Sequence, residues 1–312
     1  MFEILFLGTS ASAPSLKRSL PSLLVTHDEF RYMIDCGEGT QRQILTSGCG
    51  FKRLNKILFT HSHLDHILGV AGLLSTLLRW ENMEEMDIYG GEDTLIRVKD
   101  LLFSVVLRGN QTPNLLKFHH LQEGLLFDER DFTVKTFPVY HRGSDSFGFR
   151  FDRKSRRPFL PEKAEALAIP PGPWRRSLVE GKAVTLPDGR TIQPDQVLDD
   201  LIEGESLVVI GDTGETDSLM PHVQGADALV IEATYTEEEA DYADKFSHMT
   251  AKRSAQFAKD AGVGALYLTH ISRRYREKQI LEEAQAIFPN TTVARDFSHF
   301  VIRKNQEKTA EN

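Results

Sequence analysis

The segment His61-Ser62-His63-Leu64-Asp65-His66 is the most informative stretch of this sequence. It places three imidazoles and a carboxylate within six residues. Burying such groups without partners is costly, whereas neutral imidazole and carboxylate are standard ligands for Zn²⁺ and similar ions. In an extended loop His61 and His63 can point to the same side, and Asp65 and His66 can reach a neighbouring point as a helix begins. The segment therefore predicts half of a site for two metal ions, in preference to a surface histidine cluster.

Three further candidate ligands, His141, Asp212 and His270, each follow an apolar, strand-like stretch. Taken singly, each has an ordinary structural explanation, as a strand-end histidine, a turn residue or a neighbour of a helix start. Together they supply the number of ligands that the first segment lacks. The two oxygens of Asp212 can bridge two ions about 3.5–4 Å apart, the spacing of two-metal hydrolases.

The same placement of polar groups after strands recurs along the chain, which predicts a mixed α/β fold. Helices are expected at Ile67–Leu78, at Thr94–Val106 and from about Thr250 to Ala261. The segments expected to form strands are Ile4–Leu7, Leu23–Val25, Tyr32–Ile34, Lys56–Phe59, Met86–Tyr89, Leu207–Ile210, Ala228–Ile231 and Ala265–Leu268. Because such folds gather functional groups at strand ends, the separate clusters are expected to form one shared site.

Residues 150–205 differ in character from the rest of the chain. They contain the basic stretch Arg150–Arg157, the proline-rich run Ile169–Pro173 and the turn signal Pro187-Asp188-Gly189. We expect an inserted arm with little core of its own. From composition alone, the basic stretch is interpreted as a solvated loop. Residues 304–312 are expected to form a polar tail.

Composition excludes several classes of protein. The net charge of −8 argues against broad nonspecific binding of nucleic acid. No apolar run approaches the roughly 18 residues of a membrane span, and the start of the chain lacks the features of a signal peptide. With only two cysteines, Cys36 and Cys49, a secreted disulfide framework is not indicated. We therefore expect reduced thiols in a cytoplasmic protein that does not enter a membrane.

The motif His61-x-His63-x-Asp65-His66, with the later His141, Asp212 and His270, resembles the metallo-β-lactamase superfamily. Within it, the chain is similar to the ribonuclease Z family over roughly residues 1–303. The segments that carry this closer resemblance are Leu7–Pro14, Asp35–Gln43, Asp65–Leu73, Gly211–Thr213, Ser247–Thr250 and Ser272-x-Arg274-Tyr275. The resemblance implies a four-layer αββα sandwich formed by 1–149 and 206–303, with two metals at one edge and 150–205 as an inserted arm.

The resemblance also implies the role of each site residue. One metal would take His61, His63, His141 and Asp212, and the other would take Asp65, His66, Asp212 and His270. The implied cofactors are two Zn²⁺ per subunit, with Mn²⁺ or another divalent ion as an alternative. Asp65 would accept a proton from the attacking water. His248 would protonate the leaving oxygen, and Glu232 would stabilise its charged form.

The implied activity is endonucleolytic removal of the 3′ trailer from precursor tRNA, leaving a 3′-hydroxyl on the tRNA and a 5′-phosphate on the trailer. The arm, about Arg150 to Val197, would clamp tRNA, and Ala168–Pro173 matches its proline–glycine feature. With the resemblance considered, binding of RNA by the basic stretch becomes the favoured interpretation. A homodimer is also implied. The sequence departs from the family at Lys17–Ser22 and after Pro173.

Three other interpretations remain at this stage. Another hydrolase of the same fold, acting on a small phosphodiester, an arylsulfate or a thioester, would not need a basic arm. A catalytically silent RNA-binding subunit would not need the full set of ligands and proton-transfer residues. A redox enzyme of the superfamily would need an iron site or a flavin module, and the chain has no further domain for a flavin.

Overall fold

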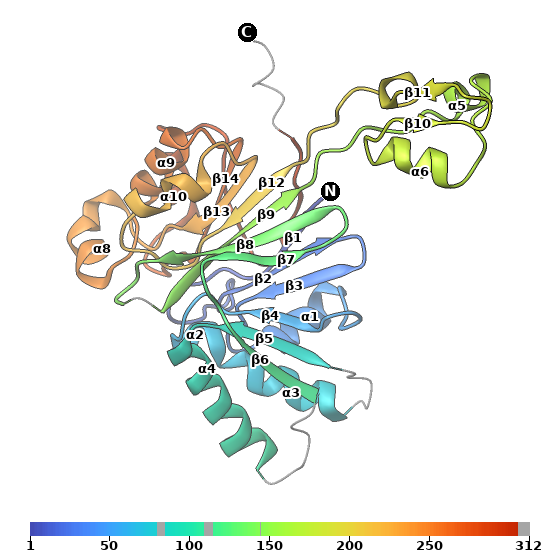
Figure 1. The fold of residues 1–312 in the computed structure, drawn as a ribbon. Helices are drawn as coiled ribbons and strands as arrows, with labels where there is room; N and C mark the ends of the chain where they lie inside the picture. Colours follow the sequence, from blue (N-terminus) through green and yellow to red (C-terminus); the bar gives the residue numbers. More distant parts are fainter. Residues whose placement is uncertain (80–84, 109–114, 144, 305–312) are drawn as a thin grey trace. The chain divides into compact units, whose positions relative to one another are not determined.

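The computed structural model describes residues 1–79, 85–108, 115–143 and 145–304 (Figure 1). The chain forms two compact units. The first consists of Met1–Asp152 and Glu205–Asn312, and the second of Arg153–Gly204. The polar tail expected at 304–312 lies outside the described residues from position 305 onward.

The first unit contains two seven-stranded sheets. In spatial order, the first sheet consists of β16 (His299–Val301), β1 (Glu3–Gly8), β2 (Ser22–His27), β3 (Phe30–Ile34), β4 (Lys56–Leu58), β5 (Met86–Gly90) and β6 (Leu116–His120). The second consists of β15 (Thr291–Val293), β14 (Ala265–Thr269), β13 (Ala228–Glu232), β12 (Ser206–Val209), β9 (Ser146–Arg153), β8 (Phe132–Val139) and β7 (Gly124–Asp128). Neighbouring strands are parallel from β3 to β6 and from β12 to β15, so their carboxyl ends point the same way.

Three apolar layers explain the order of sheets and helices. Alternate residues of β1 point to opposite faces: Ile4 and Phe6 belong to the core between the sheets, whereas Leu5 and Leu7 pack on the outer side of the first sheet. Helices α1 (Thr40–Ser47) and α3 (Gly69–Arg79) cover that outer side, and α9 (Ala251–Asp260) and α10 (Glu277–Gln285) cover the second sheet. The expected αββα sandwich is therefore confirmed.

The helix expected at Ile67–Leu78 is in fact two helices, α2 (Leu64–Ile67) and α3. The break lies where the chain passes very close to the β3–α1 connection. The amide of Gly69 donates to the carbonyl of Cys36 at 2.8 Å, and a Cβ at Gly69 would lie 1.9 Å from the carbonyl oxygen of Gly37. Backbone packing at this contact thus interrupts a pattern that reads as one continuous helix.

The helix expected at Thr94–Val106 also differs from a regular α-helix. Helix α4 spans Glu92–Lys99 and continues as the π-helix η1, Asp100–Leu107. Other short helices in the described part of this unit are α7 (Met220–Val223), α8 (Ala240–Phe246) and the 3₁₀ turns Asp217–Leu219 and Glu237–Glu239. Thr234, which follows β13, and Ser247, which follows α8, contribute to the candidate site described below.

The second unit, Arg153–Gly204, has its own apolar core, which corrects the expectation of an arm with little core. It contains α5 (Pro161–Ala166), α6 (Pro173–Val179), the hairpin β10 (Val184–Thr185) and β11 (Thr191–Ile192), and the 3₁₀ turn Pro194–Gln196. The buried side chains are Ala164, Ile169, Leu178, Leu186, Ile192 and Val197. The insertion was expected to begin at residue 150, but β9 continues to Arg153, and Arg150 pairs with Val208 of the sheet.

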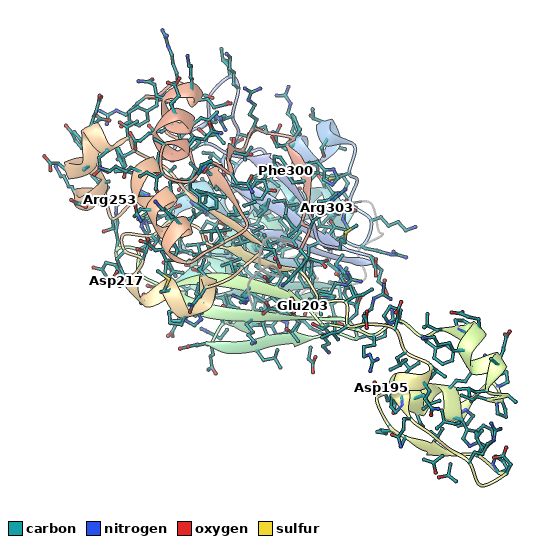
Figure 2. All side chains as sticks on the ribbon, turned by 90° about the horizontal axis from the view of Figure 1, so that it is seen from above. Asp195, Glu203, Asp217, Arg253, Phe300 and Arg303 are labelled. Atoms are coloured by element: carbon teal, nitrogen blue, oxygen red, sulfur yellow. The ribbon has the colours of Figure 1, made fainter. Side chains whose placement is uncertain are left out.

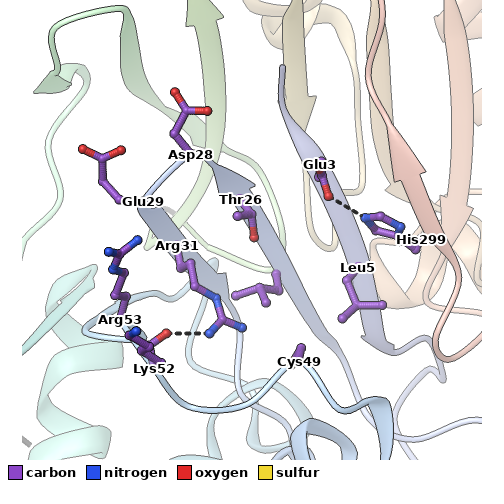
Figure 3. A pocket seen from close by; sticks show the side chains of 11 residues that line it. Glu3, Leu5, Thr26, Asp28, Glu29, Arg31, Cys49, Lys52, Arg53 and His299 are labelled. Atoms are coloured by element: carbon purple, nitrogen blue, oxygen red, sulfur yellow. Dashed lines mark hydrogen bonds and ion pairs between the residues drawn. The ribbon is translucent and has the colours of Figure 1, made fainter.

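A hollow of about 410 Å³ lies against the outer face of the first sheet, at the end of β1 away from Gly8 (Figure 3). Three of its lining side chains are engaged: His299 bonds Glu3 at 2.9 Å, and Arg31 donates to the carbonyl of Lys52 at 2.6 Å. None of the candidate ligands predicted from the sequence lines this hollow, so it is not the candidate active site.

The cysteines and the helix lengths bear on two further expectations from the sequence. Cys36 is buried, Cys49 is partly exposed, and neither forms a disulfide. Within the ranges that the structure covers, no helix has the length and apolar character needed to cross a membrane.

Candidate active site

All seven candidate ligands lie together at one edge of the sandwich, where strands of both sheets end. His61 follows β4, and Asp65 and His66 lie in the single turn of α2. His141, Asp212 and His270 follow β8, β12 and β14 of the second sheet. The loop before α2 explains the placement of His61 and His63. Its backbone is extended, and side chains two positions apart in extended backbone point to the same side.

The ligand atoms form two adjoining groups joined by Asp212. The first group is His61, His63, His141 and Asp212, and the second contains Asp65, His66 and His270. The Oδ2 atom of Asp212 lies 3.6 Å from Nε2 of His61 and 3.8 Å from Nε2 of His141. Its Oδ1 atom lies 3.5 Å from Nε2 of His66 and 3.4 Å from Nε2 of His270. The carboxylate therefore faces both groups, one oxygen to each.

The chemistry of these atoms fits bound cations. The Nε2 atoms of His61 and His66 and the Oδ1 atom of Asp212 are buried and have no hydrogen-bond partner among the described residues. Unsatisfied buried polar atoms are rare and cost about 1–3 kcal/mol each, so three of them within the two ligand groups fit bound cations. Together with the fold, the donor set indicates binding of divalent metal.

Outer hydrogen bonds orient the ligands, as expected for metal-binding histidines. The Nδ1 atom of His66 bonds Asp35 at 2.7 Å, that of His141 bonds the carbonyl of Ser247 at 2.6 Å, and that of His270 bonds Thr234 at 2.8 Å. In each case the other ring nitrogen is left facing the cluster. No role for these outer partners is predicted from the sequence.

Asp35 is the most connected of these supporting residues. Besides His66, its carboxylate accepts from the amide and the hydroxyl of Thr60, both at 2.8 Å. The hydroxyl of Thr60 also lies 3.0 Å from Nδ1 of His61. Asp35 has φ +58, in the left-handed region that is uncommon for residues other than glycine. This conformation is visible only in the folded chain, so the sequence carries no clear signal for the role of Asp35.

A second histidine–carboxylate cluster, His27 with Asp28 and Asp131, lacks this outer support. Nε2 of His27 lies 2.8 Å from Asp131, but its Nδ1 is buried without a partner among the described residues. A metal on Nε2 would place a proton on Nδ1, where no acceptor is available. The cluster is therefore better explained as a hydrogen bond that connects β2 to the β7–β8 turn.

The electrostatics separate the histidines into two kinds. Burial lowers the pKa of His61 well below its ordinary value, and it lowers the pKa of His63 to about 4, with His141 adding to the effect. Burial also acts to lower the pKa of His66, but the charges of Asp212 and Asp35 outweigh it and raise that pKa well above its ordinary value. Ligand histidines must be neutral to bind metal, which His61 and His63 are over a wide pH range.

His248 and Glu232 lie beside the metal groups. Nδ1 of His248 is 2.9 and 3.1 Å from the two oxygens of Glu232, which is completely buried at the end of β13. Burial alone would lower the pKa of His248, but the charge and hydrogen bond of Glu232 outweigh it and raise the pKa to about 9. Thus the structure brings all nine residues named from the sequence to one place.

The basic residues of the second unit are partly engaged within that unit. Arg157 pairs with Asp195, which Figure 2 labels, and donates to the carbonyl of Asp199 at 2.8 Å. Arg175 donates to the carbonyl of Ile169 at 2.8 Å, which fixes the turn before α6. Gly172 precedes that helix with φ +111, a conformation open to glycine.

Comparison with known proteins places these features in a family. A family profile described as the anti-Pycsar protein Apyc1 matches residues 2–157, half of the chain, so this part also belongs to the sequence family that the profile describes. A beta-lactamase superfamily domain profile matches residues 182–271. The Bacillus subtilis protein YhfI, of metallo-β-lactamase fold, shares the fold at a TM-score of 0.68 and 18% identity, over 96% of this chain and 98% of that protein.

More specific relatives match nearly the whole chain. A ribonuclease Z of Bradyrhizobium diazoefficiens is 48% identical, over 97% of this chain and 100% of the relative. A ribonuclease Z of Archaeoglobus fulgidus is 37% identical, over 95% of this chain and 96% of the relative. The structure of human tRNase Z, short form, matches at a TM-score of 0.66 and 26% identity, over 96% of this chain and 99% of that chain. The chain belongs to the ribonuclease Z family, within the superfamily of the metallo-β-lactamase fold.

Proposed function

We propose that this protein is an endoribonuclease that removes the 3′ trailer from precursor tRNA. The observation that carries the proposal is the complete set of ligands and proton-transfer residues at one sheet edge, in a chain that is 48% identical to a ribonuclease Z. The products are a 3′-hydroxyl on the tRNA and a 5′-phosphate on the trailer, because water and not the ribose 2′-hydroxyl attacks the phosphorus.

The cofactors would be two Zn²⁺ ions per subunit, which the two ligand groups, with Asp212 facing both, would hold. Bound there, the ions supply an activated nucleophile at neutral pH and compensate the charge of the phosphodiester. The donor set of imidazole and carboxylate suits Zn²⁺, with Mn²⁺ as the alternative.

The chain's own residues move the protons. Asp65 accepts the proton of the attacking water: its Oδ2 is held by the amide of Ser12 at 2.9 Å, and its side chain is 14% exposed, open to substrate. The hydrogen bond from His270 and the nearby charge of His66 overcome burial and lower the pKa of Asp65, so the carboxylate is ionised. His248, kept protonated by Glu232, donates to the leaving 3′-oxygen.

The remaining parts of the proposal concern partners and location. The unit Arg153–Gly204 binds precursor tRNA through its basic side chains, which compensates for an overall charge of −8. The protein acts as a homodimer in the cytoplasm. Gel filtration with light scattering tests the dimer, and a catalytically complete monomer would refute it.

The main test is cleavage of a 3′-extended precursor tRNA by metal-replete protein, with Asp65→Ala and a chelated sample as controls. The expected result is a cut next to the discriminator base, a 3′-hydroxyl on the tRNA, and loss of activity in both controls. Failure of the metal-replete protein to cut, or a cyclic phosphate at the new end, would refute the proposal.

A further inference from the structure

A row of aromatic rings extends from His248 along helix α8. The ring of Tyr235 lies 6.0 Å from that of His248 and 6.5 Å from that of Tyr242, with 13° between the two tyrosine planes. The ring of Phe246 lies 6.3 Å from Tyr242 at 10°. Tyr242 is 44% exposed, and Tyr235 and Phe246 are partly exposed. We refer to Tyr235, Tyr242 and Phe246 as the ring row; its planes are nearly parallel, and it connects the proposed proton donor to the protein surface.

Three cationic side chains lie over these rings. The guanidinium of Arg142 is 5.3 Å from the centre of Phe246, and the ammonium of Lys245 is 5.5 Å from it. Arg274 lies 5.3 Å from the centre of Tyr242. Arg142 is fixed by a 2.9 Å hydrogen bond from its Nε to the carbonyl of Phe246. Positive charge is therefore held beside the ring faces, which is the arrangement that binds the backbone and bases of single-stranded nucleic acid.

The segment also contains carboxylates, and several of them have partners. Asp244 pairs with Arg253 of α9, labelled in Figure 2, and Glu239 accepts from the hydroxyl of Tyr275 and from Arg274. Glu237 accepts from Thr250 at 2.7 Å.

Arg142 and Lys245 can offer their positive charge to a ligand. Among the described residues, neither Arg142 nor Lys245 has a carboxylate within ion-pair distance, and both side chains are exposed. The exposed carboxylates of Glu238 and Asp241 form no ion pair with Arg142 or Lys245. Two cations without a carboxylate partner, next to stacked rings and a buried catalytic histidine, favour an anionic, planar ligand.

We propose that the ring row, with Arg142 and Lys245, binds the unpaired nucleotides of the RNA strand that lead to the scissile phosphate. Bases stack on the exposed ring faces, and the two cations contact phosphates. This inference rests on the proposed function and adds to it the residues that hold the single strand. Stacking tolerates any base, because every base has a π face, so the contact positions the strand without reading its sequence.

The first test compares Tyr242→Ala, Tyr242→Phe and wild type on a 3′-extended precursor tRNA and on bis(p-nitrophenyl) phosphate. Loss of one base stack predicts a fall in kcat/KM of about tenfold on the RNA relative to the small ester, mainly through KM. Tyr242→Phe keeps the ring and restores cleavage of RNA. Phe103→Ala, which removes a similarly exposed ring on η1, serves as the control and changes neither activity. Equal losses on both substrates would overturn the inference.

A binding experiment separates this inference from the proposed function. A fluorescent single-stranded oligoribonucleotide is titrated into protein that carries Asp65→Ala, which prevents cleavage. Adding Tyr242→Ala should raise its Kd about tenfold, and adding Lys245→Gln should reduce the slope of log Kd against log salt by about 0.7, the value for one phosphate contact to a single strand. Unchanged Kd and slope would overturn the inference even if wild type cuts tRNA. A weakened Kd with no cutting of tRNA by wild type would refute only the proposed function.

Discussion

His66 illustrates how single residues shape this site. One ring nitrogen bonds Asp35 at 2.7 Å, and the other lies 3.5 Å from Asp212. The sequence identified His66 and Asp212 because they occur in a recognisable pattern. It assigned no role to Asp35, because a lone aspartate after a strand resembles an ordinary turn residue, and only the folded chain brings it to a histidine 31 positions away.

Replacing Asp35 by Asn should weaken metal binding without preventing folding. The amide keeps the shape but loses the charge that orients His66 and Thr60, and loss of such a partner typically lowers metal affinity about 10–100-fold. Competition with a zinc chelator measures the change. Asp131→Asn alters the similar pair with His27 and should leave metal affinity unaltered. An Asp35→Asn protein with the metal affinity of wild type would show that the contact is structural.

Replacing His248 by Ala should abolish most turnover while leaving the metals in place. His248 is in contact with Glu232 but is not needed to complete either ligand group, so its loss removes a proton donor, an effect of about 10²–10⁴-fold. Single-turnover cleavage and metal analysis of the same sample test this. A parallel loss of metal would make His248 a ligand or a structural residue instead.

At the scale of elements, the connection from β4 to α3 determines the geometry of the site. The helical pattern from Ile67 onward predicted the presence of a helix, but not the break at Leu68. The break arises because Gly69 packs against the backbone of Cys36 and Gly37, and contacts between distant backbone segments leave no periodic signal in the sequence. In the same way, the side-chain pattern of η1 did not reveal its π-helical hydrogen bonding.

Gly69→Ala should therefore destabilise the protein strongly. The new methyl group would meet the carbonyl of Gly37 at 1.9 Å, and relief requires moving backbone beside the site, which we expect to cost about 2–4 kcal/mol. Gly72→Ala is the matched control: it lies in the same helix, and its nearest contact is the side-chain oxygen of Gln41 at 3.0 Å, so the change should be close to neutral. Urea denaturation measures both. Equal stability of the two variants would contradict this account.

At the scale of the whole molecule, the strands that form short apolar runs were predicted from the sequence, whether their neighbours are antiparallel, as for β1, or parallel, as for β13. Strands β12 and β13 are buried on both faces and read as continuous apolar runs, and β14 buries every second residue. Strands β6 to β9 were not predicted. Polar residues interrupt their apolar residues, as Thr133 and Lys135 do in β8, and β7 (Gly124–Asp128) is largely exposed. The ligands could be named because they form a recognisable pattern, whereas their outer partners, such as Asp35 for His66 and Thr234 for His270, come from neighbouring segments that only folding brings together.

Removing Arg153–Gly204 should leave the first unit folded. Asp152 and Ser206 are direct partners across β9 and β12, so a short glycine-rich turn can join them without disturbing either sheet. We expect the shortened protein to keep its metal and its activity on bis(p-nitrophenyl) phosphate, and to lose cleavage of precursor tRNA. Retained cleavage of precursor tRNA would refute the proposed role of this unit.

Glu277 connects distant parts of the chain, and its contribution to stability should depend on pH. Hydrogen bonds from Arg295 outweigh burial and, with the charges of Arg295 and Arg18, lower the pKa of Glu277. A lowered pKa stabilises the folded state above the unfolded value of about 4.3, and this stabilisation is lost as the pH falls through the folded value. The stability difference between wild type and Glu277→Gln should be constant at neutral pH and shrink in acid. A difference independent of pH would exclude the ion pairs as its cause.

The distribution of ligands between the two sheets has a mechanical consequence. His61, His63, Asp65 and His66 come from the first sheet, whereas His141, Asp212 and His270 come from the second. Ions bound by these ligands would crosslink the two sheets at this edge of the sandwich. Removing the ions would leave like-charged and unsatisfied groups facing each other there. Treatment with a chelator should therefore loosen the packing of the two sheets at this edge as well as stop catalysis. The supply of metal would then set the lifetime of the folded protein.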